Sequence, residues 1–216
     1  LDPNEIRRAM PAAARRRIGM LELHWKLDST SSELARRAGD LPDLGFVFAE
    51  MQTAGRGRRG RSWLSPPASN LYFSCLKRFD GGYASLSGLS LAAGVAIAQA
   101  LEDCGVRGIG LKWPNDLVHG DAKLAGILVE LGGEFLGPCH AVIGVGVNVR
   151  MPRAVRAAIA QPVTDLEGIC ASATPSRNRL AAAMVARLCT VLDEFARAGF
   201  GAFVQDYARR DALCGR

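Results

Sequence analysis

Residues 108–130 decide the fold, and their sequence is GIGLKWPNDLVHGDAKLAGILVE. Two strand-like runs, residues 117–119 and 123–130, flank the dipeptide Gly120-Asp121. Because a Gly-Asp pair supplies the turn chemistry of a hairpin, the two runs should pair antiparallel. The segment therefore predicts an antiparallel sheet at the centre of the chain.

The rest of the chain adds strands to this hairpin and helices beyond it. Further strand-like runs, rich in β-branched and aromatic residues, cover residues 45–50, 70–76, 108–113 and 141–149. Helical spacing or capping signals cover residues 29–38, 84–104, 152–160, 178–198 and 202–210. Because the helices concentrate in the C-terminal third, separate from a largely antiparallel sheet, the predicted fold class is α+β.

The composition is that of an ordinary globular protein. The chain has 216 residues, of which 49% are hydrophobic and 22% are charged, so a folded core in one domain is expected. The most apolar stretch, residues 86–101, is interrupted by polar residues and is too short for a comfortable bilayer crossing. The first 20 residues lack the apolar run of a secretory signal, so a cytoplasmic location is expected.

The cysteine and charge patterns narrow the function classes. Six cysteines lie far apart, with no C-x-x-C pair, which argues against structural zinc and against a disulfide scaffold. The formal net charge is +6, but four arginines fall within residues 56–61, and without them the charge is +2. The basic excess therefore belongs mainly to one loop, which favours a compact anionic ligand over a nucleic-acid duplex.

The basic loop contains residues 55–61, GRGRRGR, which fit the letters of a dinucleotide fingerprint. That interpretation fails because the following Trp63-Leu64-Ser65-Pro66-Pro67 cannot continue as the helix that a pyrophosphate site needs. Glycines instead allow close backbone approach, and arginines bind carboxylate or phosphate oxygens. We expect a mobile loop that an anion orders; a solvated turn or a nucleic-acid patch is the alternative.

Two other motifs carry polar groups at strand ends. Residues 112–116, KWPND, set a lysine, an asparagine and an aspartate close together, although a plain salt-bridged hairpin entry would also explain them. Lys123 begins an otherwise apolar strand. Glycines at 126, 144 and 146 lie inside core strands, where they admit something against bare backbone or mark a bulge.

Taken together, six motifs in this order and spacing resemble the bacterial biotin protein ligases: DSTSS at 28–32, QTAGRGRRGRSW at 52–63, NLYFS at 70–74, KWPNDL at 112–117, KLAGILVE at 123–130 and GVGVN at 144–148. The resemblance implies a mixed sheet backed by helices, akin to class II aminoacyl-tRNA synthetases and lipoate ligases. It implies activation of biotin by ATP to biotinyl-5′-AMP, followed by transfer of biotin to a lysine of an acceptor protein.

The resemblance also assigns roles to individual residues. For biotin it implies Ser29, Thr30, Ser31, Gln52, Gly55, Arg56, Gly57, Arg58, Lys123, Gly126, Leu128 and Gly144. For ATP it implies Arg58, Arg61, Trp63, Lys112, Asn115, Lys123 and Asn148, with Mg²⁺ accompanying the nucleotide and no protein metal site. The catalytic candidates are Lys123 and Arg58, together with Asp116 as the proton acceptor for the attacking lysine.

The resemblance implies a domain plan and partners as well. We expect residues 1–20 to be a linker from an N-terminal DNA-binding domain, residues 21–210 to be the catalytic domain, and residues 211–216 to begin a C-terminal domain. The expected partners are the biotin carboxyl carrier protein of acetyl-CoA carboxylase and a second copy in a homodimer, with DNA bound only through the further domain. A lipoate or octanoyl ligase and a basic nucleic-acid-binding module remain as alternatives.

Overall fold

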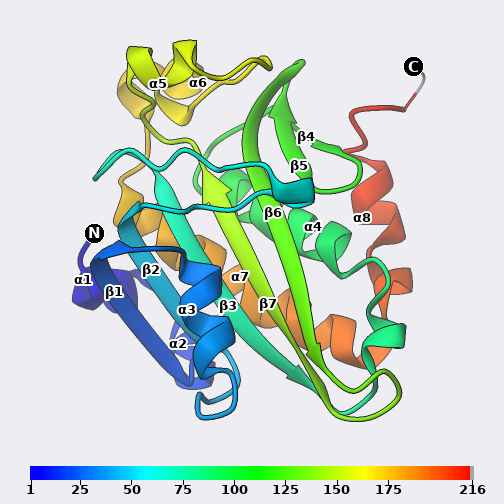
Figure 1. Ribbon diagram of the computed structural model, residues 1–216. Helices are drawn as coiled ribbons and strands as arrows, with labels where there is room; N and C mark the ends of the chain where they lie inside the picture. Colours follow the sequence, from blue (N-terminus) through cyan, green and yellow to red (C-terminus); the bar gives the residue numbers. More distant parts are fainter. Residues whose placement is uncertain (215–216) are drawn as a thin grey trace.

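A computed structural model describes residues 1–214, in which the strands form one seven-stranded sheet (Figure 1). The order across the sheet is β1-β2-β3-β7-β6-β5-β4. β1 and β2 are parallel, and every other neighbouring pair is antiparallel. The predicted α+β class with a mixed, largely antiparallel sheet is therefore confirmed. The strands are β1 Met20–Leu27, β2 Gly45–Gln52, β3 Leu71–Phe79, β4 Ile109–Lys112, β5 Asp116–His119, β6 Ala122–Gly133 and β7 Cys139–Val147.

Two long helices, α4 (Leu89–Asp103) and α7 (Arg177–Ala198), cover the back of the sheet and bury the main core (Figure 1). Alternate residues of β2 and β3 point into this core, and the rings of Phe48 and Phe73 stack at 4.8 Å between centroids. Each buried ring removes a large apolar area from water, which is the main stabilising contribution here.

Helix α3 (Thr30–Arg37) covers only part of the opposite face. Its buried Leu34 packs with Val47, Leu76 and Val142, which come from β2, β3 and β7. Towards the upper ends of β6 and β7 in Figure 1, the segment that follows β2 crosses this face instead of a helix. This division leaves room for a pocket between α3 and the crossing segment.

The remaining helices lie around the margins. α1 (Pro3–Ala9) and α2 (Ala12–Arg17) pack against α7, and Ile6 is fully buried there, so the segment expected as a linker contributes to the core. The others are α5 Arg153–Ala157, α6 Leu166–Cys170 and α8 Val204–Ala208. None of the helices within residues 1–214 combines the length and apolar character that a bilayer crossing requires.

Several element boundaries differ from the sequence prediction for local reasons. The helix predicted from residue 84 begins at Leu89, because Ser87 is not helical and Gly88 adopts a left-handed φ of 85°. The strand β1 and the helices α1, α2 and α6 were missed. β1 is an edge strand with an exposed Trp25 and charged neighbours, so its pattern lacks the apolar run of a core strand.

The predicted domain boundaries stay predictions. Residues 21–210 include all seven strands except the first residue of β1. At the end of the described chain, the backbone of Ala212 donates to the carbonyl of Leu111 on β4. Residues 215 and 216 of the segment expected to begin a C-terminal domain lie outside the described residues.

One buried ion pair connects the start of α7 to the sheet. Glu50 at the end of β2 is 5% exposed and accepts from Arg177 Nη2 at 3.2 Å; the Leu1 amino group also contacts it. Burial by itself raises the pKa of the Glu50 carboxyl, but the contacts with Arg177 and the amino group lower it below 4.5 overall. Glu50 thus adds stability above the unfolded-state pKa, and this is lost as the pH falls through the lower folded pKa.

We therefore expect Arg177→Ala to reduce the free energy of unfolding by about 3 kcal/mol at pH 7, because it leaves a buried carboxylate short of its main cation. The deficit relative to wild type should shrink as the pH falls, because loss of Arg177 leaves burial to raise the pKa of Glu50 in the folded variant, and protonated Glu50 no longer needs the cation. Urea unfolding at several pH values measures both effects. Arg187→Ala breaks an exposed pair with Asp103 and should cost less than about 1 kcal/mol; equal losses in the two variants would contradict this account.

Candidate active site

A cavity of about 130 Å³ opens on the α3 face of the sheet. Its walls come from the start of α3, the segment after β2, the strands β3, β6 and β7, and the chain beyond β7. Most of the residues proposed from the sequence meet there, although they are spread over 120 positions of the chain. The proposed residues that line the cavity are Ser29, Thr30, Ser31, Gln52, Arg56, Gly57, Arg58, Arg61, Trp63, Asn115, Lys123, Gly126, Leu128, Gly144 and Asn148.

One end of the cavity is polar and uncharged. Ser29 caps α3 by accepting from the Ser32 backbone at 3.4 Å, which holds the start of the helix and its hydroxyls at the cavity wall. Thr30 donates its backbone N–H to Gln52 Oε1 at 2.9 Å, and Gln52 Nε2 donates to Ser65 Oγ at 3.0 Å. Gln52 therefore connects the start of α3 to the segment that crosses the sheet.

The glycines of β6 and β7 make space for particular side chains. Gly126 and Gly146 are register partners, and the Trp63 indole lies against both. A Cβ at Gly146 would lie 2.5 Å from Trp63 Cε2, and one at Gly126 would lie 2.9 Å from Trp63 Cζ3. A Cβ at Gly144 would lie 2.5 Å from Ser31 Oγ. β7 pairs regularly with β3 and with β6 through Gly144 and Gly146, so the bulge considered from the sequence for these two positions is wrong.

Lys123 lies at the opposite, cationic end. Its Nζ is 2.7 Å from Asp116 Oδ1 and 5.4 Å from the centre of the Trp63 ring. The lysine and aspartate side chains are only 14% and 21% exposed, so their interaction is weakly screened by solvent. Asp116 of the KWPND motif and Lys123 therefore form an ion pair that the sequence did not predict.

The basic loop folds over the cavity as a small closed turn. Trp63 donates its N–H to the Gly55 carbonyl at 2.8 Å, and Gly57 donates to the Arg61 carbonyl at 2.7 Å. Residues Arg58–Gly60 form a 3₁₀ turn and no α-helix follows, which confirms that this is not a dinucleotide fingerprint. Whether an anion orders the loop stays a prediction.

Two arginines of the loop make side-chain contacts across it. Arg56 pairs with Glu130 at 2.7 Å, and Arg58 Nη1 donates to Asn115 Oδ1 at 3.3 Å. Asn115 in turn donates to the Ile127 carbonyl at 2.8 Å, which ties the turn between β4 and β5 to β6. Both guanidinium groups thus have a partner on the sheet or on the turn between β4 and β5, although Arg56 itself is exposed to solvent.

Three proposed residues lie outside the cavity lining. Gly55 is buried under the loop, where a Cβ would lie 2.4 Å from the Trp63 carbonyl oxygen. Lys112 is exposed at the end of β4. Asp116 reaches the cavity only through its contact with Lys123.

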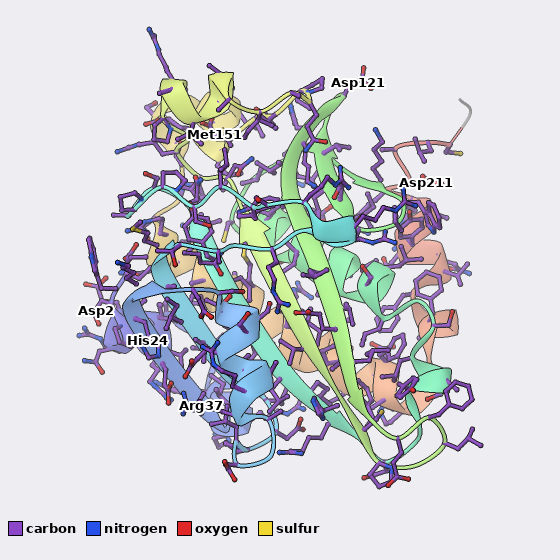
Figure 2. The ribbon with its side chains drawn as sticks, in the orientation of Figure 1. Asp2, His24, Arg37, Asp121, Met151 and Asp211 are labelled. Carbon is purple, nitrogen blue, oxygen red and sulfur yellow. The ribbon has the colours of Figure 1, made fainter. Side chains whose placement is uncertain are left out.

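Other residues that line the cavity were not predicted from the sequence. Met151, Ile159, Gln161 and Val163 line the cavity from the chain between β7 and α6, and Figure 2 shows Met151 beneath α5 and α6. This chain is fixed beside β6 because Lys123 donates its N–H to the Pro162 carbonyl, at 2.9 Å. Its composition carries no motif, so no sequence signal would have identified it. Ser74, in contrast, lies inside the quoted NLYFS motif and was passed over.

The cavity thus has one end lined by hydroxyl and amide groups and a cationic end, and the Trp63 indole lies against Gly126 and Gly146. The family model that matches residues 26–148 is the biotin/lipoate A/B protein ligase family. The chain belongs to this family. The match spans the α3 start, the basic loop and all strands from β2 to β7, so the family assignment covers the cavity walls except the segment beyond β7.

Known members of the family support this assignment. The chain is 39% identical over 190 residues to the bifunctional ligase/repressor BirA of Escherichia coli (strain K12), covering 88% of this chain and 59% of that protein. It is 35% identical to the biotin–[acetyl-CoA-carboxylase] ligase of Mycobacterium tuberculosis over 78% of this chain and 62% of the relative. The chain thus spans about three fifths of these curated relatives.

A solved structure agrees in fold. The biotin protein ligase from Aquifex aeolicus, in complex with biotin and ATP, superposes with a TM-score of 0.74 at 27% identity. The superposition covers 89% of this chain and 78% of that one. The ligase-like fold expected from the sequence motifs is therefore confirmed.

The contact of the Trp63 indole with Gly126 and Gly146 leads to a direct prediction. Gly146→Ala should push the indole off β7 and cost roughly 1–3 kcal/mol, because aromatic carbon lies where the new methyl must go. Iodide quenching of Trp63 fluorescence should increase, measured in a background carrying Trp25→Phe and Trp113→Phe, since both of those side chains are exposed. Gly39→Ala adds a methyl to open space and serves as the control. Unchanged quenching in Gly146→Ala would show that the indole does not rest on this strand.

Proposed function

We propose that this chain is the catalytic core of a biotin protein ligase. It would activate biotin with ATP to biotinyl-5′-AMP and transfer the biotinyl group to a lysine of a carboxyl carrier protein. The observation that carries the proposal is the two-ended cavity, which offers uncharged hydrogen-bonding groups at one end and Lys123, Arg58 and Arg61 at the other. Biotin has the matching form, a cyclic urea at one end and a carboxylate at the other.

The polar end would hold the ureido ring. Ser29, Thr30, Ser31 and Gln52 are the groups proposed to hydrogen-bond it, and Gly144 leaves the space that the Ser31 hydroxyl occupies. Gly126 and Leu128 would lie along the valeryl chain on β6. The basic loop, with the backbone of residues 55–58, would close over the ring and the carboxylate.

The cationic end would carry out the adenylation. The biotin carboxylate attacks the α-phosphorus of ATP, pyrophosphate leaves, and the charge that develops on the phosphate oxygens needs fixed cations. Lys123 and Arg58 are the proposed catalytic groups, because both are held in place by neighbours. Arg61, Trp63, Asn115 and Asn148 would contact the nucleotide, and Lys112, outside the lining, would reach only its outer part.

The transfer step needs a neutral amine on the acceptor protein. Asp116 is the proposed proton acceptor, and its pairing with Lys123 connects it to the site where the adenylate would form. When Lys123 turns to the phosphate of the adenylate, the carboxylate is released to receive the proton. No covalent enzyme intermediate is required in either step.

Magnesium enters this proposal only with the nucleotide. Within residues 1–214 no group of three or more His, Cys, Asp or Glu side chains could hold a metal ion. Mg²⁺ in nucleotide sites is bound largely by phosphate oxygens and water. The metal would therefore arrive as the magnesium complex of ATP and would neutralise phosphate charge there.

The wider assignments follow from the same proposal. The acceptor would be the biotin carboxyl carrier protein of acetyl-CoA carboxylase, and the name of the Mycobacterium tuberculosis relative specifies acetyl-CoA carboxylase as the protein that it modifies. A cytoplasmic location is consistent with the free cysteines of the described chain. A homodimer, and DNA binding through a further domain as in a ligase/repressor, remain proposals drawn from the family.

The test of the function is pyrophosphate release from ATP in the presence of biotin or lipoate, because pyrophosphate leaves in the activation step and needs no acceptor protein. Biotin should stimulate pyrophosphate release and lipoate should not, because a dithiolane ring offers no partner for the hydroxyl-rich end of the cavity. Preference for lipoate would assign the chain to the other branch of its family. If neither acid supports ATP turnover and the protein binds DNA with a steep salt dependence, a nucleic-acid-binding module is favoured.

Lys123→Ala should lower the rate of biotin-dependent ATP–pyrophosphate exchange roughly 100- to 1,000-fold, because it removes a cation held beside the developing charge. The biotin Kd, measured by calorimetry, should change by less than about tenfold. Lys26→Ala removes an exposed lysine of β1 and should leave both quantities unaltered. A Lys123→Ala enzyme with wild-type exchange would exclude the catalytic role.

A further inference from the structure

Ser74 on β3 is fully buried beneath the polar end of the cavity. It lies opposite Gly144 of β7 and does not line the cavity itself. Its Oγ is 2.8 Å from Thr30 Oγ1 and 2.9 Å from Ser31 Oγ, so it touches two of the hydroxyls proposed to bind the ligand. The direction of these hydrogen bonds can be worked out, because each hydroxyl has a single hydrogen to donate.

Gln52 fixes the direction of the hydrogen bonds of Thr30. The Thr30 backbone N–H can only donate, so the Gln52 atom that it meets at 2.9 Å is the carbonyl oxygen. The Thr30 hydroxyl lies 3.2 Å from the same oxygen, which can only accept. The Thr30 hydrogen is therefore directed to Gln52, and in its contact with Ser74 the Thr30 oxygen must accept.

Ser74 in turn fixes the direction of the Ser31 hydrogen bond. Since Thr30 accepts, Ser74 donates its hydrogen to Thr30. Ser74 then has only lone pairs left for Ser31, so the Ser31 hydroxyl donates inward to Ser74. Towards the cavity, Ser31 consequently presents lone pairs and acts as a hydrogen-bond acceptor.

Ser29 has the opposite character. Its Oγ accepts from the Ser32 N–H in the cap of α3, which uses a lone pair and leaves the hydroxyl hydrogen for another partner. The start of α3 thus offers a donor at Ser29 and an acceptor at Ser31, two residues apart. A ring with a C=O beside an N–H matches this pattern, and a ring with only acceptors does not.

We propose that Ser74 is a positioning residue that keeps Ser31 in the accepting orientation and so makes the cavity selective for a ring N–H. The inference rests on the proposed function and adds a specificity device to it. Ser74 acts through Ser31 and Thr30 and has no contact with the ligand. Without the Ser74 hydroxyl, Ser31 can rotate and donate into the cavity, and the selection against ring oxygen weakens.

The experiment compares biotin with the two cyclic carbamates in which one or the other ring N–H is replaced by oxygen. In ATP–pyrophosphate exchange, Ser74→Ala should raise the KM for biotin about fivefold, the effect of losing about one hydrogen bond, while kcat stays within about twofold. The wild-type preference for biotin over the less favoured carbamate should fall about tenfold in kcat/KM, because Ser31 becomes able to donate.

Cys75→Ala provides the matched control. Cys75 is the next residue of β3, is equally buried and belongs to the core on the other face of the sheet. Its truncation should lower the melting temperature without altering the preference between biotin and carbamates. If Ser74→Ala does not fold, Ser74→Cys carries the same test, because a thiol donates and accepts only weakly.

The outcomes separate the two proposals. Wild-type protein that shows no biotin-dependent exchange overturns the proposed function. Wild-type protein that is active with biotin, with a Ser74 variant that keeps the wild-type preference, overturns the role of Ser74. Equal losses for biotin and both carbamates also overturn it, since they indicate general damage to the pocket.

Discussion

The indole of Trp63 lies against bare backbone at Gly126 and Gly146, and the arrangement of the site follows from this contact. Gly126 and Gly146 are partners in the pairing of β6 with β7, so the ring covers both of them. A side chain at either position would displace the ring. The indole in turn faces the Lys123 ammonium, which is paired with Asp116. Because β6 and β7 have glycine at these positions, Trp63 can pack flat against the sheet. This contact fixes one end of the basic loop.

The same sheet serves stability and function on opposite faces. The back face is filled by α4 and α7, with large apolar residues from the central strands. The front face is covered by the short helix α3 at one end only. Because α3 begins at the cavity, its capping serine and the next two hydroxyls are placed where a ligand would lie.

Two of the cations that line the cavity are paired with carboxylates, and a third has a neutral partner. Arg56 has Glu130, Lys123 has Asp116, and Arg58 has the neutral Asn115. The pairs hold the cations at fixed positions, while Arg58 keeps an uncompensated charge beside the cavity. The negative charge of a bound anion would therefore meet a cation that is already in place. This agrees with a site that binds carboxylate and phosphate groups.

The sequence by itself determined an antiparallel hairpin within residues 117–130, the strand character of β2, β3 and β7, and most of the residues that line the cavity, because these depend on local turn chemistry and on motifs with fixed spacing. The edge strand β1 and the helix α2 were not predictable in this way, since their position depends on packing against β2 and α7. Helix α1 does carry a local signal, Asp2 as N-cap before Pro3, which the prediction of a linker did not use. Only the tertiary structure decided that Gly126, Gly144 and Gly146 make room for Trp63 and Ser31, and that Ser74 and Met151 belong to the site. These roles arise from contacts between residues far apart in the chain, and neither residue type nor spacing along the sequence records such contacts.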